Sequence, residues 1–599
     1  RPTHPEPDVK LRFNWNSAIN IDPFNNGTIY FGSQFVHKSI DKGLTWELIS
    51  EDLTTNDPEK QKQNESGGIS LDATGAENHT TILVIEPSPL EQDMLWVATD
   101  DGRVHYTQNG GNEWNEVSNN LPGLPKGSWI TQIKASNKNK GEALLVANDY
   151  RRFNYEPYAY RTTNYGKSWQ RIVDKDDVLS YALCIIEDPV EKNLLFLGTD
   201  DGLYLSIDAG ISWEKWTNGF PTVSVKDLVI QERENDLVIG TFGRAAWVLD
   251  DLKPLRSIAK NNEVLASDIV LFEAPDAYQV SFQQPTGSRF GADAIFQGEN
   301  RVYGARIPYY FQKKEKENSK DTDPSEKNKE EEKEEDVDEK ITEGKHKDSI
   351  YLKIYDGDRL IRSLKKKTPD STGIYYWRWS MNEAGADRPS REIKKRKNEP
   401  RGVSVKPGTY RLELKHLDDT TSSSIEIKSD PRVKISEIAI NARYQRGKEL
   451  EELTQTTANA VKQLAESKGI AEKYKVDLAK KDKVLYLEEI KASKIIIKRI
   501  DSIIDRYVGK EDKRQGITNS SNVPVTNRIS TASRYSGSRP NGITKTEIVL
   551  IQQAKEKLEA VLKETNLFFK TDWENYKIIM NQLDLSPFKK TESYFINEN

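Results

Sequence analysis

The chain has 599 residues, a formal net charge of −6 and a pI of about 5.9. This length exceeds the roughly 250–300 residues at which a single hydrophobic core stops growing, so several domains are expected. The acidic balance, without a dense basic patch, argues against a nucleic-acid partner. No apolar run approaches the roughly 18 residues of a transmembrane segment. The single cysteine, Cys184, excludes a disulfide framework and disfavours a eukaryotic secreted origin.

One short motif, [S/T]-x-[D/N]-x-G-x-x-W, recurs along the N-terminal part of the chain. Its copies run from Ser39 to Trp46, from Thr107 to Trp114, from Thr162 to Trp169 and from Ser206 to Trp213. The Asp or Asn side chain is expected to accept from backbone N–H groups two residues on, and the hydroxyl at the first position to do likewise. Gly supplies a positive φ, and Trp packs the turn onto a sheet. These Asp-box residues are therefore predicted to be structural and not catalytic.

Strand-like runs surround the boxes and repeat with them. A run with a small-residue step precedes each box, and a fifth run at residues 237–244 is followed by residues 246–249 without a box. Each unit reads as strand, turn, strand, box, strand, which is typical of a four-stranded propeller blade. The pattern predicts about five β-propeller blades over residues 10–255, with the unboxed unit as the closing blade.

The boxes, the stretch at residues 157–169 and the segment from Gly240 to Leu252 together resemble the bacterial sortilin-like (BNR, or Asp-box, repeat) β-propeller proteins. The resemblance covers roughly residues 10–255 and implies a propeller that holds a peptide or a protein. Two departures stand out. The cysteine-rich module of animal sortilins is missing, and five blades are few for this family.

The N-terminal residue is Arg1 and not Met, and residues 1–7 read as a linker that opens directly into blade sequence. The preferred expectation is that an N-terminal portion with a signal peptide and the remaining blades is missing, as in a cleaved product whose other piece stays associated. The alternative is a small propeller that is complete after its leader has been processed.

Beyond the propeller, residues 267–433 carry several short strand patterns and a predicted hairpin turn at Asp356-Gly357, which favour an immunoglobulin-like β-sandwich. A Lys/Glu/Asp-rich insert at residues 313–347 lacks apolar residues and is predicted to be a solvated or disordered loop. The sequence Arg306-Ile307-Pro308 matches a carboxylate-binding motif of sialidases. Because it follows the boxes instead of preceding them, we interpret it as coincidental.

From residue 437 to residue 599 the apolar pattern becomes helical and predicts an α-helical hairpin or bundle. Thr544 and Glu547 form a capping box that starts the last long helix. Residues 510–543 are predicted to form an extended loop, since residues 516–542 are rich in Ser, Asn and Arg. We expect the bundle mainly to pack on itself. The fold class is thus mainly β, with propeller blades, a sandwich and C-terminal helices.

The sequence contains few motifs of catalytic, metal-binding or cofactor-binding sites. The six histidines show no metal-ligand spacing, no nucleophile elbow or phosphate loop is present, and Cys184 is expected to be a buried thiol. We therefore predict no catalytic, metal or cofactor-binding residue and no cofactor. Carboxylates recur at predicted strand ends, namely Asp100, Asp101, Asp149, Asp200, Asp201, Asp250 and Asp251. Glycosidases need two carboxylates about 5–5.5 Å or about 6.5–9.5 Å apart, but hairpins also require Asp-Gly turns.

Two function classes follow. The favoured one is a non-enzymatic, extracytoplasmic component of a bacterial cell-surface complex that binds a protein or peptide, in the outer membrane region, secreted or in the periplasm. The expected partners are a protein or peptide, the missing N-terminal portion and an outer-membrane complex. The alternative is a glycoside hydrolase of the sialidase or xyloglucanase type. Abundant Lys, Asn and Ile are typical of low-GC bacteria such as the Bacteroidetes.

Overall fold

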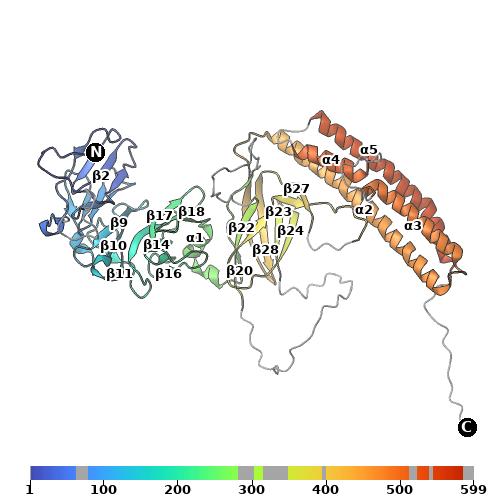
Figure 1. Cartoon of the computed structure of the whole chain (residues 1–599), viewed down its shortest axis with the longest axis horizontal. Coiled ribbons are helices and arrows are strands. Elements are labelled where there is room, and N and C mark those ends of the chain that lie inside the picture. The colour runs from blue at the N-terminus through green and yellow to red at the C-terminus, as the bar shows by residue number, and fades with distance from the viewer. Residues whose placement is uncertain are drawn as a thin grey trace, which may run out of the picture. The chain divides into compact units, whose positions relative to one another are not determined.

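The computed structural model describes residues 2–62, 78–280, 303–314, 349–393, 399–510, 523–538 and 544–583 (Figure 1). The chain divides into two compact units, Arg1–Asp268 and Ile269–Asn599, and each is treated by itself. The predicted charged insert lies outside the described residues from residue 315 onward.

The first unit consists of consecutive antiparallel sheets in which strands follow chain order, as in the blades of a β-propeller. Blades 1 to 4 have four strands each, and blade 5, which lacks a box, has three. The strands are β1 (Ile19–Ile21), β2 (Ile29–Gly32), β3 (Val36–Ser39), β4 (Glu47–Leu48); β5 (Ile82–Pro87), β6 (Leu95–Thr99), β7 (Val104–Thr107), β8 (Asn115–Glu116); β9 (Trp129–Ala135), β10 (Ala143–Asp149), β11 (Asn154–Thr162), β12 (Gln170–Arg171); β13 (Ala182–Glu187), β14 (Leu195–Thr199), β15 (Gly202–Ser206), β16 (Glu214–Lys215); β17 (Val225–Gln231), β18 (Asp236–Thr241) and β19 (Ala246–Leu249). Short helical turns are η1 (Pro58–Gln61), η2 (Ser118–Asn120), η3 (Tyr150–Arg152) and η4 (Asn262–Ala266).

Each Asp-box closes a tight turn through its own side chains. In blade 1 the Ser39 hydroxyl accepts from the Gly43 N–H at 2.8 Å, and Asp41 accepts from the Thr45 N–H at 2.8 Å. The same bonds recur at the other boxes, where Asn109, Asn164 and Asp208 accept from the N–H four residues on. The bonds of the acidic or amide residue thus reach four residues along the chain, not two as predicted, and the turns that they close hold the box glycines at positive φ.

The boxes also join neighbouring blades. The indole N–H of Trp114 in blade 2 donates to the Ile49 carbonyl of blade 1 at 3.0 Å, and Trp213 in blade 4 donates to the Ile172 carbonyl of blade 3 at 2.8 Å. The box glycine packs on the same residue: a Cβ on Gly111 would clash with the Ile49 carbonyl oxygen. We call this contact the box lock. It requires a box in one blade and an apolar residue directly after the fourth strand of the preceding blade.

Helix α1 (Lys253–Lys260) follows blade 5 and packs against blade 4. Arg256 forms a buried ion pair with Asp188 at 2.8 Å, and the Asn193 side chain donates to the Ala259 carbonyl. Asp188 also accepts from two backbone N–H groups of its own loop, so the buried carboxylate is fully satisfied. The helix therefore anchors the end of the blade series to the fourth blade.

The second unit begins with an immunoglobulin-like β-sandwich, as predicted. One sheet has the order β20-β22-β25, the other has the order β21-β29-β28-β23-β24, and β26 and β27 form a separate hairpin. The strands are β20 (Ile269–Leu271), β21 (Ala277–Gln279), β22 (Ala305–Phe311), β23 (Ser349–Asp356), β24 (Arg359–Lys367), β25 (Gly373–Trp379), β26 (Asn382–Ala384), β27 (Arg401–Ser404), β28 (Gly408–His416) and β29 (Asp419–Ser429). The predicted Asp-Gly hairpin joins β23 and β24, with Gly357 at φ +60°.

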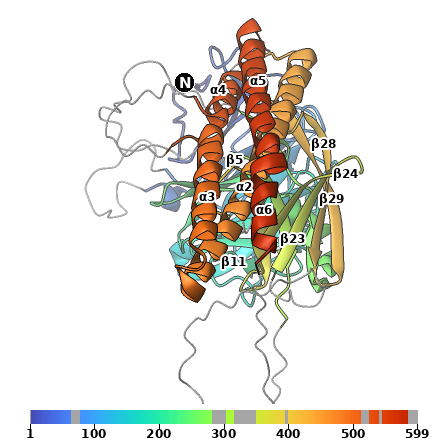
Figure 2. The same cartoon turned by 90° about the vertical axis from the view of Figure 1, so that its right-hand side faces the viewer.

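The helical part contains α2 (Glu437–Asp482), α3 (Leu487–Val508), α4 (Val525–Gly537), α5 (Lys545–Phe568), a π-helical turn η5 (Phe569–Trp573) and α6 (Glu574–Asn581). Both views show α3 and α5 lying alongside α2 (Figures 1 and 2). The sequence predicts an extended loop at residues 510–543. This prediction is wrong for residues 525–537, which form α4. Val525, Ile529 and Ala532 are buried at helical spacing, a stripe that the surrounding Ser, Asn and Arg residues conceal in the sequence.

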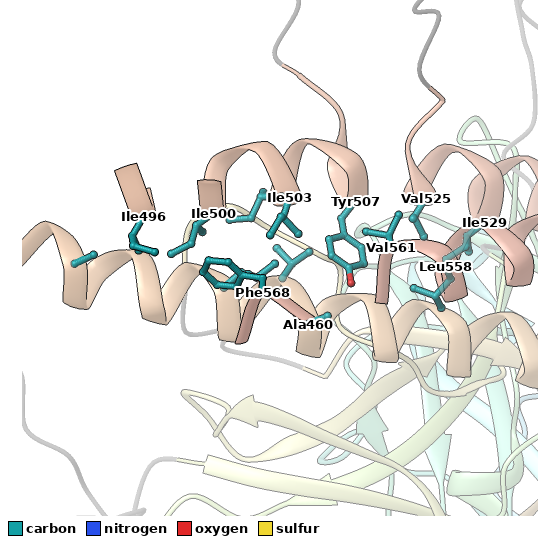
Figure 3. Packing of buried hydrophobic residues seen from close by; sticks show 14 of the residues in the cluster. Ala460, Ile496, Ile500, Ile503, Tyr507, Val525, Ile529, Leu558, Val561 and Phe568 are labelled. Carbon is teal, nitrogen blue, oxygen red and sulfur yellow. The ribbon is translucent and has the colours of Figure 1, made fainter. Parts of the chain in front are cut away.

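The helices share one apolar core (Figure 3). Ile500, Ile503 and Tyr507 of α3 meet Leu558, Val561 and Phe568 of α5, with Ala460 of α2 beneath them. The Tyr507 hydroxyl forms a hydrogen bond with Thr565 at 2.8 Å, so the buried phenol is satisfied. The predicted capping box is present at Thr544 and Glu547. Among the described residues, no helix combines the length and the apolar character needed to cross a bilayer.

Glu383 of β26 connects the sandwich to α2. Its carboxylate accepts from Arg359 of β24 at 2.8 Å, from the Tyr444 hydroxyl at 2.6 Å and from Lys448 at 3.1 Å. Burial alone would raise the pKa of Glu383, but the hydrogen bonds from these three partners outweigh burial and lower the pKa to about 2.

The first prediction concerns the box lock. Gly111→Ala introduces both positive-φ strain and the clash with Ile49, whereas Gly43→Ala introduces only the strain, since its nearest atom is the Trp46 ring at 3.5 Å. We expect Gly111→Ala to destabilise the first unit by about 2–4 kcal/mol and Gly43→Ala by about 1–2 kcal/mol. Urea unfolding of both variants measures the difference. Equal losses would contradict the box lock.

The second prediction concerns pH. The folded pKa of Glu383 lies below its unfolded value near 4.5, so its stabilisation is present above pH 4.5 and is lost as the pH falls toward 2. Glu383→Gln should cost about 2–3 kcal/mol at pH 7, because Arg359 and Lys448 lose their shared counter-charge while remaining partly solvated. Hydrogen exchange of α2 amides at residues 444–451 measures this cost. The difference in opening free energy between the wild type and the variant should decrease below pH 4. A difference that does not depend on pH would contradict the assignment.

Candidate binding surface on the propeller

Blade 3 departs from the repeat at one end of its strands. In blades 2 and 4 the second and third strands are joined by Asp-Asp-Gly turns that begin at Asp100 and Asp200. In blade 3 the connection between β10 and β11 instead contains η3, followed by Phe153 in the left-handed conformation at φ +63°. Phe153 and Tyr155 are exposed although both are large aromatic residues. Exposed aromatic groups on a strained connection are typical of a binding site.

Aromatic rings and one arginine gather around this connection. The Arg151 guanidinium lies 3.2 Å from the centre of the Trp129 ring and 4.4 Å from that of Tyr150. Tyr150 stacks on Tyr181 with ring centres 4.7 Å apart, and Tyr155 lies 6.2 Å from Tyr181. We call this group, with His79 at 6.4 Å from Trp129, the aromatic surface. Its members are His79, Trp129, Tyr150, Arg151, Tyr155 and Tyr181.

Three successive blades contribute to the aromatic surface. His79 precedes the first strand of blade 2, Trp129 begins the first strand of blade 3, and Tyr181 precedes the first strand of blade 4. Trp129 is paired with Asn148 at the end of β10, which brings the blade 3 connection to the same end. The surface therefore lies at the rim where the first strands start. His79 Nδ1 is buried and has no hydrogen-bond partner among the described residues.

Two of the predicted strand-end carboxylates support this surface. Burial, and after it the neighbouring Asp200 carboxylate, raise the pKa of Tyr181 above its usual value. Asp100 is fully buried, accepts from the Thr81 N–H at 2.8 Å and from the Thr81 hydroxyl, and interacts electrostatically with His79 and Arg151. Burial raises the pKa of Asp100. These two carboxylates thus lie next to the aromatic surface.

The other strand-end carboxylates are held by local partners. Asp101 accepts from Thr55 and Thr99, Asp149 from Arg152, Asp201 from Thr199 and Lys215, and Asp251 from the Lys253 N–H. Asp250 lies at the end of β19.

The remaining predicted features are not members of the aromatic surface. Arg306 belongs to β22 of the sandwich, where its guanidinium lies 3.8 Å from the centre of the Tyr376 ring. His37 is buried beside Ser33, and burial lowers its pKa to about 4. Within the described ranges, no group of three or more His, Cys, Asp or Glu residues could hold a metal ion. His346 lies outside those ranges.

The aromatic surface matches none of the local motifs by which catalytic or metal sites are recognised in a sequence. A signal was present: the Asp-Asp-Gly turn of blades 2 and 4 is replaced in blade 3 by Asp149-Tyr150-Arg151-Arg152-Phe153. Alignment of the repeats reveals this departure. That His79 and Tyr181 belong to the aromatic surface can be seen only in the folded structure, because they lie about 70 and about 30 positions along the chain from the connection.

Comparisons with known proteins give fold-level similarity only. No known protein family's sequence profile matches the chain, and no curated protein matches it. Among solved structures, an ancestral GH74 enzyme is similar at a TM-score of 0.31 and 15% identity over 52% of this chain and 38% of that one. The GH74 xyloglucanase from Xanthomonas campestris matches at 0.30 and 13%, over 40% of this chain and 37% of that one.

A third similar structure is YCF48 from Cyanidioschyzon merolae, at a TM-score of 0.25 and 14% identity over 41% of this chain and 73% of that one. The region of similarity spans less than two fifths of the length of the two GH74 proteins. Identities and TM-scores of this size do not indicate a shared activity.

The third prediction concerns Cys184, which lies buried in β13 with its thiol directed to the Val225 carbonyl. Burial raises the pKa of the Cys184 thiol. Because the thiolate is the reactive form, we expect Ellman's reagent at pH 8 to label the native chain roughly 100-fold more slowly than the urea-unfolded chain. Rapid labelling of the native protein would contradict an inert, packed thiol.

Proposed function

We propose that this chain is a non-enzymatic, extracytoplasmic assembly component of a bacterial cell-surface complex, and that its aromatic surface binds a protein or peptide. The observation that carries the proposal is Arg151 lying over Trp129 and Tyr150, beside the stacked Tyr150 and Tyr181. Trp, Tyr and Arg are the residue types that contribute most to protein interfaces. The rings hold the guanidinium in place, so little side-chain entropy is lost on binding.

The sequence resemblance to the bacterial sortilin-like propeller proteins supports the same proposal, because it implies a propeller that holds a peptide or a protein. The bound segment is expected to carry acidic or aromatic side chains. Arg151 offers a positive charge and the exposed rings of Phe153 and Tyr155 offer apolar contact.

A glycoside hydrolase is the second candidate. One observation favours it: a carboxyl group with a raised pKa, Asp100, lies near an aromatic surface, and a general acid requires such a pKa. The full burial of Asp100 and its two hydrogen bonds to Thr81 favour the binding role instead, since a general acid must reach its substrate.

The fourth prediction tests the proposed function. Peptides are selected from a display library on the immobilised chain, and their affinity is measured by calorimetry. Arg151→Ala combined with Tyr155→Ala should weaken binding at least about 10-fold, or about 1.4 kcal/mol. Arg233→Ala is the matched control, because Arg233 is an exposed arginine in the turn between β17 and β18.

The same preparation is assayed for sugar release from xyloglucan and from sialylated glycans. The proposal expects no release. Release that Asp100→Asn abolishes, while the display selection yields no peptide sensitive to Arg151→Ala, would replace the binding function with the hydrolase.

A further inference from the structure

Blade 1 has one covered face and one open face. Asn20 points to blade 2, where its side chain donates to the Ile85 carbonyl at 3.0 Å and to Glu86. Side chains alternate along a strand, so Ile19 and Ile21 point away from blade 2. They are 68% and 56% exposed, and they pair across the sheet with Phe31 and Ile29. In contrast, the first four residues of β13 in blade 4 are buried on both faces.

The box of blade 1 lacks the contact that the other boxes make. In blades 2, 3 and 4 the box glycine packs on a β-branched residue that follows the fourth strand of the preceding blade, namely Ile49, Val117 and Ile172. A Cβ on Gly43 would meet only the Trp46 ring. The indole N–H of Trp46 is buried and has no hydrogen-bond partner among the described residues.

Trp169 of blade 3 also lacks an acceptor there, but its ring packs on Trp96 of blade 2 at 5.9 Å and its box glycine contacts Val117. Blade 1 is therefore the only boxed blade in the described part of the chain whose box glycine touches no other blade. The missing contact is one that this protein repeats three times elsewhere.

The other end of the blade series is open as well. On blade 5, Val229 pairs with Val238, which pairs with Val248, so the three valines form one row across the sheet. Val229 and Val248 are each 55% exposed, whereas Leu228 on the opposite face is buried. In the described residues, no strand of blade 1 is in extensive contact with a strand of blade 5. Open apolar sheet faces of this kind mark interaction sites.

We propose that the open face of blade 1, formed by Ile19, Ile21, Ile29 and Phe31 with Gly43 and Trp46, docks a further four-stranded antiparallel blade. This blade belongs to a polypeptide segment outside the 599 residues. An apolar β-branched residue directly after its fourth strand packs on Gly43. The arrangement continues the box lock already present between blades 1 and 2.

A second copy of this chain does not supply that blade. Its open end is blade 5, which has three strands and so lacks the residue that follows a fourth strand. Docked on blade 1, it would cover the isoleucines but place no such residue on Gly43. The proposal concerns only this surface and does not depend on the aromatic surface or on the proposed function.

The fifth prediction tests this docking. A photo-crosslinking amino acid replaces Ile21 in the full chain within its native cells, and Ile211, an exposed isoleucine on the box tip of blade 4, is the matched control position. We expect a crosslinked product at position 21. The peptide linked there should come from a blade sequence that contains a box of the form [S/T]-x-[D/N]-x-G-x-x-W. The control position should give at least 10-fold less product.

A charge variant provides the second readout. Ile19→Glu combined with Ile21→Glu should lower the amount of co-purifying blade segment at least 10-fold while leaving the thermal midpoint of the isolated chain unchanged, because both side chains are exposed. No product at position 21, a crosslink to a second copy of this chain, or a crosslink to a segment without blade sequence would each overturn the proposal.

Discussion

The first unit depends on one repeated contact, in which a box glycine and tryptophan of one blade pack on the residue that ends the preceding blade. The hydroxyl and the carboxylate or amide of the box close the turn, and the turn presents the indole N–H to the neighbouring carbonyl. Burial of the tryptophan supplies the apolar contact, and the hydrogen bond sets the register between blades. The side chains of the Asp-boxes therefore form contacts within the fold, and contacts with a partner would have to come from other positions.

The aromatic surface occupies the positions that the repeat leaves free. A strand connection can change without loss of the box, because the two lie at opposite ends of the blade's strands. In blade 3 the connection carries Tyr150, Arg151 and Phe153, the first strand of the same blade begins with Trp129, and blade 4 adds Tyr181. Among the strand-end carboxylates, Asp100, Asp149 and Asp201 accept hydrogen bonds from threonine, arginine and lysine, respectively. A rigid scaffold with one altered loop is a common way of building a binding site.

Local patterns in the sequence predict the architecture well. The four boxes, the hairpin at Gly357 and the capping box at Thr544 each depend on a few neighbouring residues, so their chemistry can be read directly. Helix α4 was missed because its buried stripe is sparse and lies among Ser, Asn and Arg. The aromatic surface was missed because it combines side chains from three blades. Its hydrogen bonds and stacking exist only once the sheets are packed.

The most direct test of the central claim follows tryptophan resonances by fluorine NMR in the 5-fluorotryptophan-labelled chain. A peptide selected on the chain is added while the spectrum is recorded. The account predicts that the Trp129 resonance shifts, because its ring lies under Arg151, and that the Trp114 and Trp213 resonances do not, because the box lock buries them between blades. Shifts of the box tryptophans with an unchanged Trp129 resonance would contradict it.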